Sequence, residues 1–423
     1  MNPPTDDHLE VLVVGGGAAG AAAAKVLAEA GRTVTLVERS AAPGPTSLGG
    51  LLTPRAVAEL SRLDLTPPPG RTISSIVLVS HDHEIERPWP EVAGLPDHGL
   101  VVDRTSLGAA LLDRARRAGA NVLTGCSATD PIVERGFVRG AVVTDDHGRT
   151  SAIRSRYVIA ADGSTSRFGR SIGTFRRKDW PFVTALGGRW SSVLAGRSMA
   201  GTTEPGSRIE LHLGLSGHDA SFVAGTGWVL PSTECDVRIG IGLWSTSREF
   251  GVLNASEVLG SLAERVADRW GIDPEVPLGP HDGARIPVGG SVVPVAGPAH
   301  LVAGDAAGVA NPLSVAGIEA ALWSGRLAGE VLVEALESRD PTALQRYPSM
   351  IASTTGGYYK VGRLATRLAS HPSTSGLLAR AASSNRHLAD TALRIGLQHL
   401  RRQGGPETVY RIARTASRFG PAS

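Results

Sequence analysis

Three short motifs, spread over most of the chain, hold the residue types that bind phosphates and sugar hydroxyls. The first is a Gly-x-Gly-x-x-Gly pattern formed by Gly15, Gly17 and Gly20. Residues 162–163 and 304–305 are the other two, each an Asp beside a Gly at the end of an apolar run. Glycines let backbone N–H groups approach a pyrophosphate, and a carboxylate at a strand end can accept hydrogen bonds from sugar hydroxyls. One elongated ligand that carries both groups would use all three motifs.

The first motif lies inside a predicted strand–helix–strand unit. Residues 9–14 and 33–37 are short apolar runs, which is typical of buried parallel strands. Residues 18–30 are rich in alanine and end at a glycine, which predicts a helix. Ala18 and Ala19 open that helix, so their N–H groups should face the phosphates. A complete unit of this kind predicts a dinucleotide site rather than a bare glycine turn.

The second strand of this unit ends at Glu38, eighteen residues after Gly20. A carboxylate at this place is expected to accept hydrogen bonds from the adenosine ribose hydroxyls. The same charge would repel a 2′-phosphate, which excludes NADP from this site. We assign Arg39, the next residue, to the same adenosine end of the ligand.

The later motifs extend the predicted ligand to a flavin. Asp162 and Asp305 can both bind hydroxyls of a ribityl chain at the crevice of an open sheet. Pro312 follows in the loop after Asp305, and Gly317 and Ile318 then begin a helix. The N–H groups of that helix can face the pyrimidine edge of a flavin, where negative charge develops on reduction. The sequence therefore predicts FAD and redox chemistry.

The composition is that of a globular chain in a reducing compartment. Apolar residues make up 42% of the 423 residues, an ordinary share. Cys126 and Cys235 lie far apart and form neither a disulfide nor a metal-binding pattern. We therefore expect a cytoplasmic location and no bound metal.

Basic residues gather at the C-terminal end of the sequence. The net formal charge is only +3, but residues 356–423 contain eleven Lys or Arg against two acids. This surplus suits peripheral contact with anionic membrane headgroups, although solvated faces of C-terminal helices are the simpler explanation. The basic residues are not interleaved with stacking aromatics, so we expect no nucleic-acid partner.

The order of the apolar patterns predicts an α/β fold with a Rossmann-type domain, a parallel sheet and a small antiparallel meander over residues 132–160. Residues 182–245 alternate again and predict a larger antiparallel sheet that forms an interleaved substrate domain. A helical tail completes the chain. The expected boundaries are 1–70, 102–175 and 280–345 for the FAD-binding domain, 71–101 and 176–279 for the substrate domain, and 346–423 for the basic tail.

With these motifs, residues 8–345 resemble the flavoprotein family that joins aromatic-ring monooxygenases, squalene-type epoxidases and geranylgeranyl reductases. Within this family, residues 304–330, 52–60 and 227–231 are similar to the geranylgeranyl/menaquinone reductase branch. The resemblance implies that Arg104, at the start of a predicted helix, contacts the FAD phosphates.

Two departures from that branch affect the expected reaction. Its reductases usually carry Cys-Gly-Asp-Gly before the Leu-Thr-Pro motif, but this chain has Leu48, Gly49, Gly50 and Leu51 there. They also tend to have a tyrosine where this chain has Thr226. Without the cysteine and the acid, the protonation that an ene-reductase needs loses its expected source.

From these departures, we favour a flavin monooxygenase that epoxidises or hydroxylates a hydrophobic, isoprenoid substrate with O₂. Leu48, Leu51, Trp228 and Leu230 are the candidate pocket residues, and no side chain is assigned as catalytic. The alternative is an ene-reductase that saturates isoprenoid double bonds, with a water or a distant acid as proton source. A protein that retains FAD without turnover is the third possibility. The electron donor stays open between NAD(P)H and a separate flavin reductase.

Overall fold

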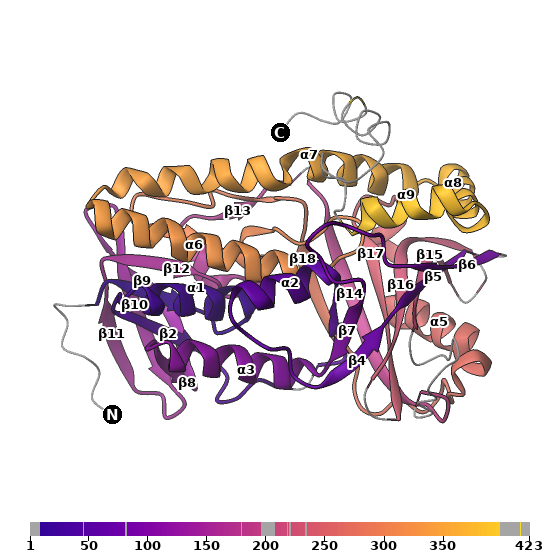
Figure 1. Ribbon diagram of the computed structural model, residues 1–423, viewed down its shortest axis with the longest axis horizontal. Coiled ribbons are helices and arrows are strands. Elements are labelled where there is room, and N and C mark those ends of the chain that lie inside the picture. The colour runs from indigo at the N-terminus through magenta and orange to yellow at the C-terminus, as the bar shows by residue number, and fades with distance from the viewer. Residues whose placement is uncertain are drawn as a thin grey trace.

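The apolar runs near the glycine motifs form a five-stranded parallel sheet (Figure 1). The computed structural model describes residues 9–397 and 415, except 45, 81–82, 179, 196–207, 218, 220 and 233–234. Central strands such as Val11–Val14 are buried along their whole length, which explains their lack of polar alternation. In sheet order the strands are β20 (His300–Val302), β12 (Tyr157–Ala160), β1 (Val11–Val14), β2 (Val34–Glu38) and β8 (Asn121–Thr124).

Helices α1 (Ala18–Glu29), α3 (Arg104–Arg117) and α6 (Ile318–Ser338) cover one face of this sheet (Figure 1). Helices α1 and α6 cross at very short range. A Cβ atom at Gly325 would overlap the backbone carbonyl of Ala19, so only glycine fits in α6 at this crossing. The first turn of α1 is thereby fixed against α6.

The small antiparallel meander covers the other face and begins earlier than the sequence pattern suggested. Its strands are β9 (Cys126–Glu134), β10 (Phe137–Asp145) and β11 (Thr150–Arg154). The end of the predicted stretch, Tyr157–Ala160, instead pairs in parallel with β1. This strand is buried throughout, so its alternation could not be told apart from that of the meander.

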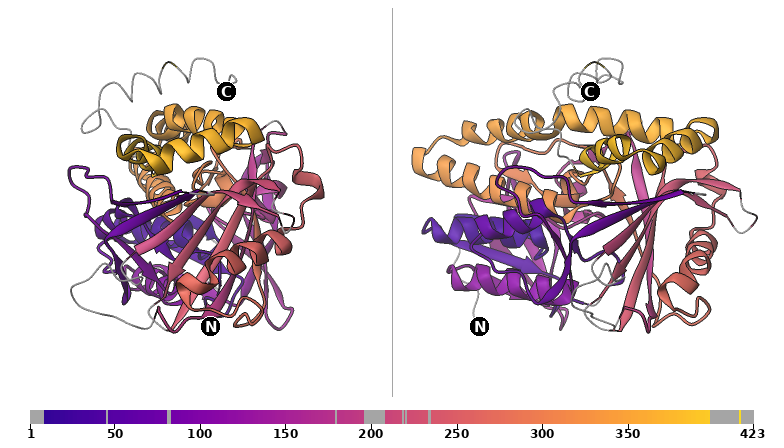
Figure 2. Two further views of the ribbon diagram at one scale, coloured as in Figure 1. Left: turned by 90° about the vertical axis from the view of Figure 1, so that its right-hand side faces the viewer. Right: turned by 45° about the vertical axis from the view of Figure 1, so that its right-hand side comes forward.

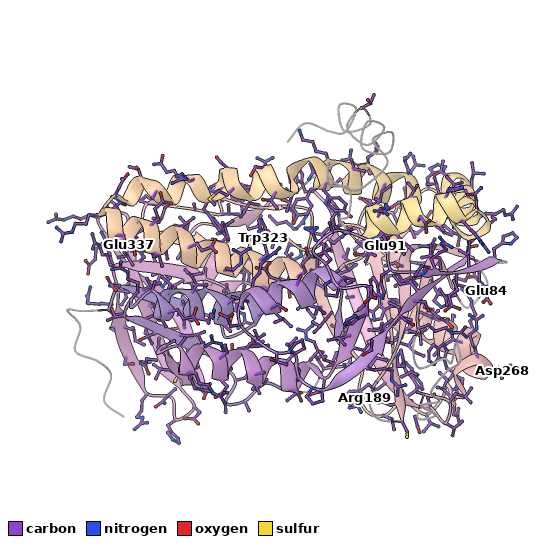
Figure 3. The ribbon with its side chains drawn as sticks, viewed as in Figure 1. Glu84, Glu91, Arg189, Asp268, Trp323 and Glu337 are labelled. Atoms are coloured by element: carbon purple, nitrogen blue, oxygen red, sulfur yellow. The ribbon has the colours of Figure 1, made fainter. Side chains whose placement is uncertain are left out.

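A second, seven-stranded sheet lies beside the parallel sheet. In sheet order its strands are β18 (Asp282–Pro287), β14 (Phe182–Ser191), β17 (Asp236–Trp244), β16 (Phe222–Pro231), β15 (Arg208–Ser216), β5 (Ser75–Ser80) and β6 (His83–Pro88). Helix α5 (Ala255–Trp270) packs against one face of this sheet, where its Leu259 belongs to the same core cluster as Ile239 of β17. In Figure 3, Glu337 of α6 and Asp268 of α5 mark opposite ends of the molecule, so the two sheets lie side by side along its length.

Helices α8 (Pro372–Ser384) and α9 (Arg386–Gly396) cover the other face of the large sheet, and α7 (Arg346–Ala369) packs against α6, α8 and α9 (Figure 2). Ala389 and Leu393 of α9 belong to the same core cluster as Leu230 of β16. The predicted basic region after residue 397 lies outside the described residues, apart from Thr415. In the described part of the chain, no helix is both long and apolar enough to span a bilayer. The shorter elements are β3 (Leu51–Leu52), α2 (Pro54–Arg62), β4 (Gly70–Ile73), β7 (Gly99–Val102), α4 (Arg167–Ser171), β13 (Phe175–Arg176), η2 (Phe250–Val252), β19 (Val292–Val293), η3 (Gly304–Ala307) and η4 (Pro341–Gln345).

One buried histidine should make the stability of this fold depend on pH. His300 begins β20, and neither ring nitrogen has a hydrogen-bond partner among the described residues. Burial lowers the pKa of His300 below its ordinary value of 6.5. The unfolded chain therefore binds a proton that the folded site disfavours, and the free energy of unfolding should fall as the pH drops below about 6.5. Denaturant titrations of the wild type and His300→Phe should show a flatter acid limb for the variant; parallel limbs would contradict this.

Candidate cofactor and substrate site

The first glycine motif forms the turn that its sequence predicts. Gly15 has a φ of +106°, and a Cβ atom there would overlap the carbonyl oxygen of Ala161 on the neighbouring strand. A Cβ atom at Gly20 would overlap the Gly15 carbonyl, so this glycine permits the close packing of helix on strand. At Gly17, by contrast, nothing lies within 4 Å of an added Cβ. The backbone at this point therefore borders open space at the N-terminus of α1. The first-motif residues that line the cavity are Gly17, Ala18 and Ala19.

Glu38 lies at the end of β2, as predicted, and its carboxylate binds the glycine turn after β1. Oε2 accepts a hydrogen bond from the Gly16 N–H at 2.6 Å, and Oε1 accepts one from the Ser40 N–H at 2.9 Å. The carboxylate is therefore held beside the glycine turn, where an adenosine ribose is expected. Arg39 is exposed next to it and does not line the cavity, so its assignment to the adenosine end stays a prediction.

Asp162 does not line the cavity, so its contact with the ribityl hydroxyls stays a prediction. Its carboxylate accepts hydrogen bonds from the Ser166 hydroxyl at 2.7 Å and from the Phe168 N–H at 2.8 Å. The Phe168 N–H at the start of α4 holds the carboxylate in this position. Gly163, with a φ of +79°, lines the cavity in its place. Asp162 thus shapes the turn that presents Gly163.

Asp305 and Arg104 line the same cavity. Among the described residues, none donates a hydrogen bond to the Asp305 carboxylate, and none pairs with the Arg104 guanidinium. Burial raises the pKa of Asp305 and lowers that of Arg104, while each charge partly offsets the shift of the other. Asp305 also caps no helix with its side chain. Half-buried groups of opposite charge at a cavity wall fit a ligand with phosphates and hydroxyls.

The loop before α6 is held by a side chain that sequence reasoning did not assign. The Oδ1 atom of Asn311 accepts hydrogen bonds from the backbone N–H groups of Leu313 and Ser314, at 2.8 and 3.1 Å. Its Nδ2 atom donates to the Tyr358 hydroxyl at 3.1 Å and to the Gly396 carbonyl at 2.8 Å. The position of Asn311 directly before Pro312 was the only sequence signal for this role. One amide group therefore joins the loop to α7 and to the end of α9.

Gly317 and Ile318 line the cavity at the start of α6, as the predicted flavin contact requires. Pro312 does not line it, so the assignment of this residue to the cofactor stays a prediction. The ring of Pro312 instead packs against Gly362 of α7, where an added Cβ would lie 2.5 Å from the proline Cγ. Pro312 thus helps to fix the loop from behind.

The glycine-rich loop before β3 also faces the cavity and is anchored at both ends. The Ser47 N–H donates to Asp282 at 2.5 Å, and buried Arg238 donates from Nη1 to the Gly49 carbonyl at 3.2 Å. Gly50 has a φ of +112°, and an added Cβ would lie 2.5 Å from the same guanidinium nitrogen. The loop residues that line the cavity are Leu48, Gly49, Gly50 and Leu51.

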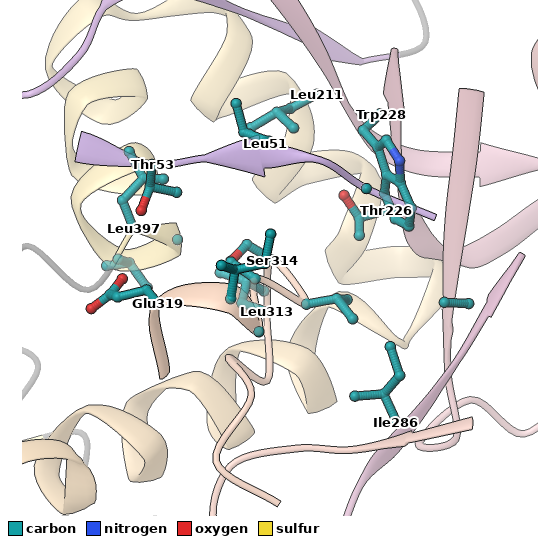
Figure 4. Close-up of a pocket in the computed structure, with 18 of the residues that line it drawn as sticks. Leu51, Thr53, Leu211, Thr226, Trp228, Ile286, Leu313, Ser314, Glu319 and Leu397 are labelled. Carbon is teal, nitrogen blue, oxygen red and sulfur yellow. The ribbon is translucent and has the colours of Figure 1, made fainter. Parts of the chain in front are cut away.

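The cavity itself has a volume of about 600 Å³ and continues from these loops to the large sheet (Figure 4). Leu51 and Trp228 contribute to the same wall, and Leu230 is buried behind them. The indole of Trp228 lies flat over Gly240, where any larger residue would collide with the ring. The structure thus brings Leu48, Leu51, Trp228 and Leu230 together around one apolar space.

The C-terminal helices complete the cavity, a role that no sequence pattern indicated. Small and aliphatic side chains from three helices form its roof. They are Ala365 and Ala369 of α7, Leu378, Ala379, Ala381 and Ala382 of α8, and Leu388, Ala392, Leu393 and Ile395 of α9, followed by Leu397. Cys126 and Cys235 do not line the cavity.

Residues 8–197 match a family model described as an FAD binding domain. A menaquinone reductase from Mycobacterium tuberculosis is 32% identical over 373 residues, which cover 87% of this chain and 85% of the relative. The chain belongs to the geranylgeranyl/menaquinone reductase branch of the FAD-dependent flavoproteins. A digeranylgeranylglycerophospholipid reductase from Methanopyrus kandleri is 31% identical to this flavoprotein over 397 residues, covering 90% and 91% of the two chains.

Solved structures confirm the fold of the flavoprotein. A geranylgeranyl bacteriochlorophyll reductase-like protein from Thermoplasma acidophilum superposes with a TM-score of 0.76 at 24% identity, covering 96% of this chain and 99% of that one. A flavin-dependent brominase superposes with a TM-score of 0.71 at 16% identity, covering 97% and 99%. As a member of this branch, the flavoprotein is an FAD-dependent oxidoreductase, and Arg104 and Asp305 fit the phosphates and the hydroxyls of that cofactor.

Replacing Asp305 should separate cofactor affinity from stability. Asp305→Asn keeps the shape but removes the charged acceptor, so FAD affinity should fall by roughly ten- to a hundred-fold. The FAD-free protein should melt at a higher temperature, because an unpaired buried carboxylate is removed. Fluorescence titration with FAD and thermal melting measure the two effects. Unchanged affinity would contradict the assignment of Asp305 to the cofactor.

Proposed function

We propose that this flavoprotein is an ene-reductase that saturates a carbon–carbon double bond in a long isoprenoid substrate. The observation that carries the proposal is the cavity, which joins the cofactor end to an aliphatic space beneath α8 and α9. The reductase names of both relatives support it. This order reverses the expectation from the sequence, which favoured oxygenation.

Reduced FAD, when bound, supplies a hydride to one alkene carbon, and the other carbon needs a proton. The protein must hold the alkene against an apolar wall that excludes water. Leu51, Trp228 and Leu213 provide such a wall. The cysteine and acid that related reductases carry are absent from residues 48–51. Thr53 and Thr226 line the cavity, and a water held beside them is the proton source we propose.

The second candidate is the flavin monooxygenase, which the aliphatic loop at residues 48–51 favours. Oxygenation needs no acid in this loop, because the reactive oxygen comes from O₂ at the flavin. One experiment decides between the two. Enzyme loaded with FAD is reduced and incubated with prenylated quinones and geranylgeranyl lipids, once without O₂ and once with it.

Under the ene-reductase proposal, the product gains the mass of two hydrogen atoms and forms without O₂. A product that gains one oxygen atom, and forms only with O₂, would overturn the proposal in favour of the monooxygenase. Equal turnover of small polar phenols would contradict an isoprenoid substrate for either reaction. A protein that holds FAD but converts none of these compounds would point to the non-catalytic alternative.

A further inference from the structure

The cavity reaches the protein surface at two leucines. Leu378 of α8 and Leu388 of α9 both line the cavity, yet they are 45% and 47% exposed. Other lining residues of the roof, such as Ala382 and Leu393, are 8% and 2% exposed. The mouth of the cavity therefore lies between α8 and α9.

Two further leucines near this mouth in the sequence are exposed to solvent. Leu377, next to Leu378, is 70% exposed, and Leu368 at the end of α7 is 45% exposed. A water-facing helix surface rarely keeps large apolar groups clustered at the opening of an apolar cavity. We call Leu368, Leu377, Leu378 and Leu388 the mouth leucines.

Cations accompany the mouth leucines on the same helices. Arg367 precedes Leu368, and Arg386 lies two residues before Leu388; both are exposed. Among the described residues, no acid lies within ion-pair distance of either guanidinium, and Asp390 of α9 is already paired with Arg87. Exposed leucines with unpaired arginines match an interface between acyl chains and anionic headgroups.

From the mouth leucines and these cations, we infer that the α8–α9 face docks on an anionic lipid bilayer and that substrate enters the cavity directly from the membrane. The inference rests on the proposed function only for the isoprenoid nature of the substrate. A molecule of that kind partitions into lipid, so an opening that faces the bilayer spares it a passage through water. The leucines would insert beside the headgroups, and the arginines would contact the lipid phosphates.

The test is co-sedimentation of the full-length, FAD-loaded protein with vesicles. Phosphatidylglycerol vesicles are compared with phosphatidylcholine vesicles for the wild type and for the double variant Leu368→Asp/Leu377→Asp. Both positions are exposed and neither lines the cavity, so the substitutions leave the substrate's binding surface unchanged. The matched control is Val133→Asp, because Val133 is 53% exposed on the remote strand β9.

The wild type and the control should bind phosphatidylglycerol vesicles, and the double variant should bind at least about tenfold more weakly. Arg367→Glu/Arg386→Glu should lose the preference for the anionic vesicles. Absence of binding by the wild type, or equal binding by the double variant and the control, would overturn the inference.

Turnover of a detergent-solubilised substrate is measured separately on the same proteins. The mouth-leucine variant should retain it, because the substrate no longer has to leave a bilayer. Vesicle binding through the leucines without any reduction of an isoprenoid would contradict the proposed function and leave the docking face intact. Reduction of an isoprenoid without vesicle binding would support the proposed function and overturn the docking inference.

Discussion

Replacing Leu51 with aspartate is expected to lower the turnover of an isoprenoid substrate by more than about a hundred-fold, while FAD stays bound. Leu51 lies in the cavity wall and packs in the same cluster as Trp228. A carboxylate there would stand unpaired against the apolar chain of the substrate, which costs several kcal/mol of binding. The flavin absorbance of the purified variant and its kcat/KM measure the two expectations.

Leu51→Ala is the control for this substitution, because it removes the same side chain without adding a charge. It should reduce kcat/KM much less than Leu51→Asp, and its melting temperature reports any loss of packing. If the aspartate variant turns over a long apolar substrate as well as the wild type, Leu51 does not line the substrate's path. Loss of FAD from both variants would instead assign the loop to the cofactor.

Arg104→Ala should weaken FAD binding by roughly a hundred-fold, through loss of a charge-assisted contact with phosphate. The guanidinium lines the cavity with no protein partner among the described residues, and burial lowers its pKa. The FAD-free variant should be at least as stable as the wild type, because an unpaired buried cation is gone. Titration with FAD measures the affinity, and melting of the FAD-free protein measures the stability.

Arg116→Ala is the matched control for this substitution, since Arg116 is an exposed arginine on the same helix. It should leave FAD affinity unchanged. Equal affinities for the Arg104 and Arg116 variants would remove Arg104 from the phosphate site. A large loss of stability in the Arg104 variant alone would mean that the residue supports the fold instead.

The first strand–helix–strand unit could be predicted almost to the residue. Residues 18–30 were expected as a helix, and α1 covers Ala18–Glu29. This success has a local cause, because the glycine spacing, the alanine run and the two apolar runs each fix their own conformation. The acid at the end of β2 follows from the same local pattern.

The roles of single polar side chains were harder to predict, because they depend on contacts that are distant in sequence. Asp162 and Asp305 follow similar apolar runs, yet only Asp305 lines the cavity, since the start of α4 binds the other carboxylate. Arg238 holds a loop 189 residues away, and Asn311 reaches α9 across 85 residues. No periodicity marks such residues.

The roof of the cavity was missed for a related reason. The small residues of α8 and α9, such as Ala382 and Ala392, resemble the ordinary inner face of any surface helix. These small side chains contribute to the site by leaving space open for the cavity. That space depends on the positions of β15 and β16. Residues 356–423 stand out in the sequence for their basic charge. Their contribution to the cavity depends instead on the shape of the packed helices.

The crossing of α1 and α6 has a consequence for the length of the ligand. Gly325 lets the two helices meet at Ala19 with backbone against backbone, so their N-terminal ends belong to one rigid block. One of these ends faces the expected pyrophosphate, and the other faces the expected flavin ring. The span between them cannot adjust to a shorter molecule. A flavin mononucleotide ends at its single phosphate and would leave the adenosine end beside Glu38 empty, so we expect the crossing to favour the full dinucleotide.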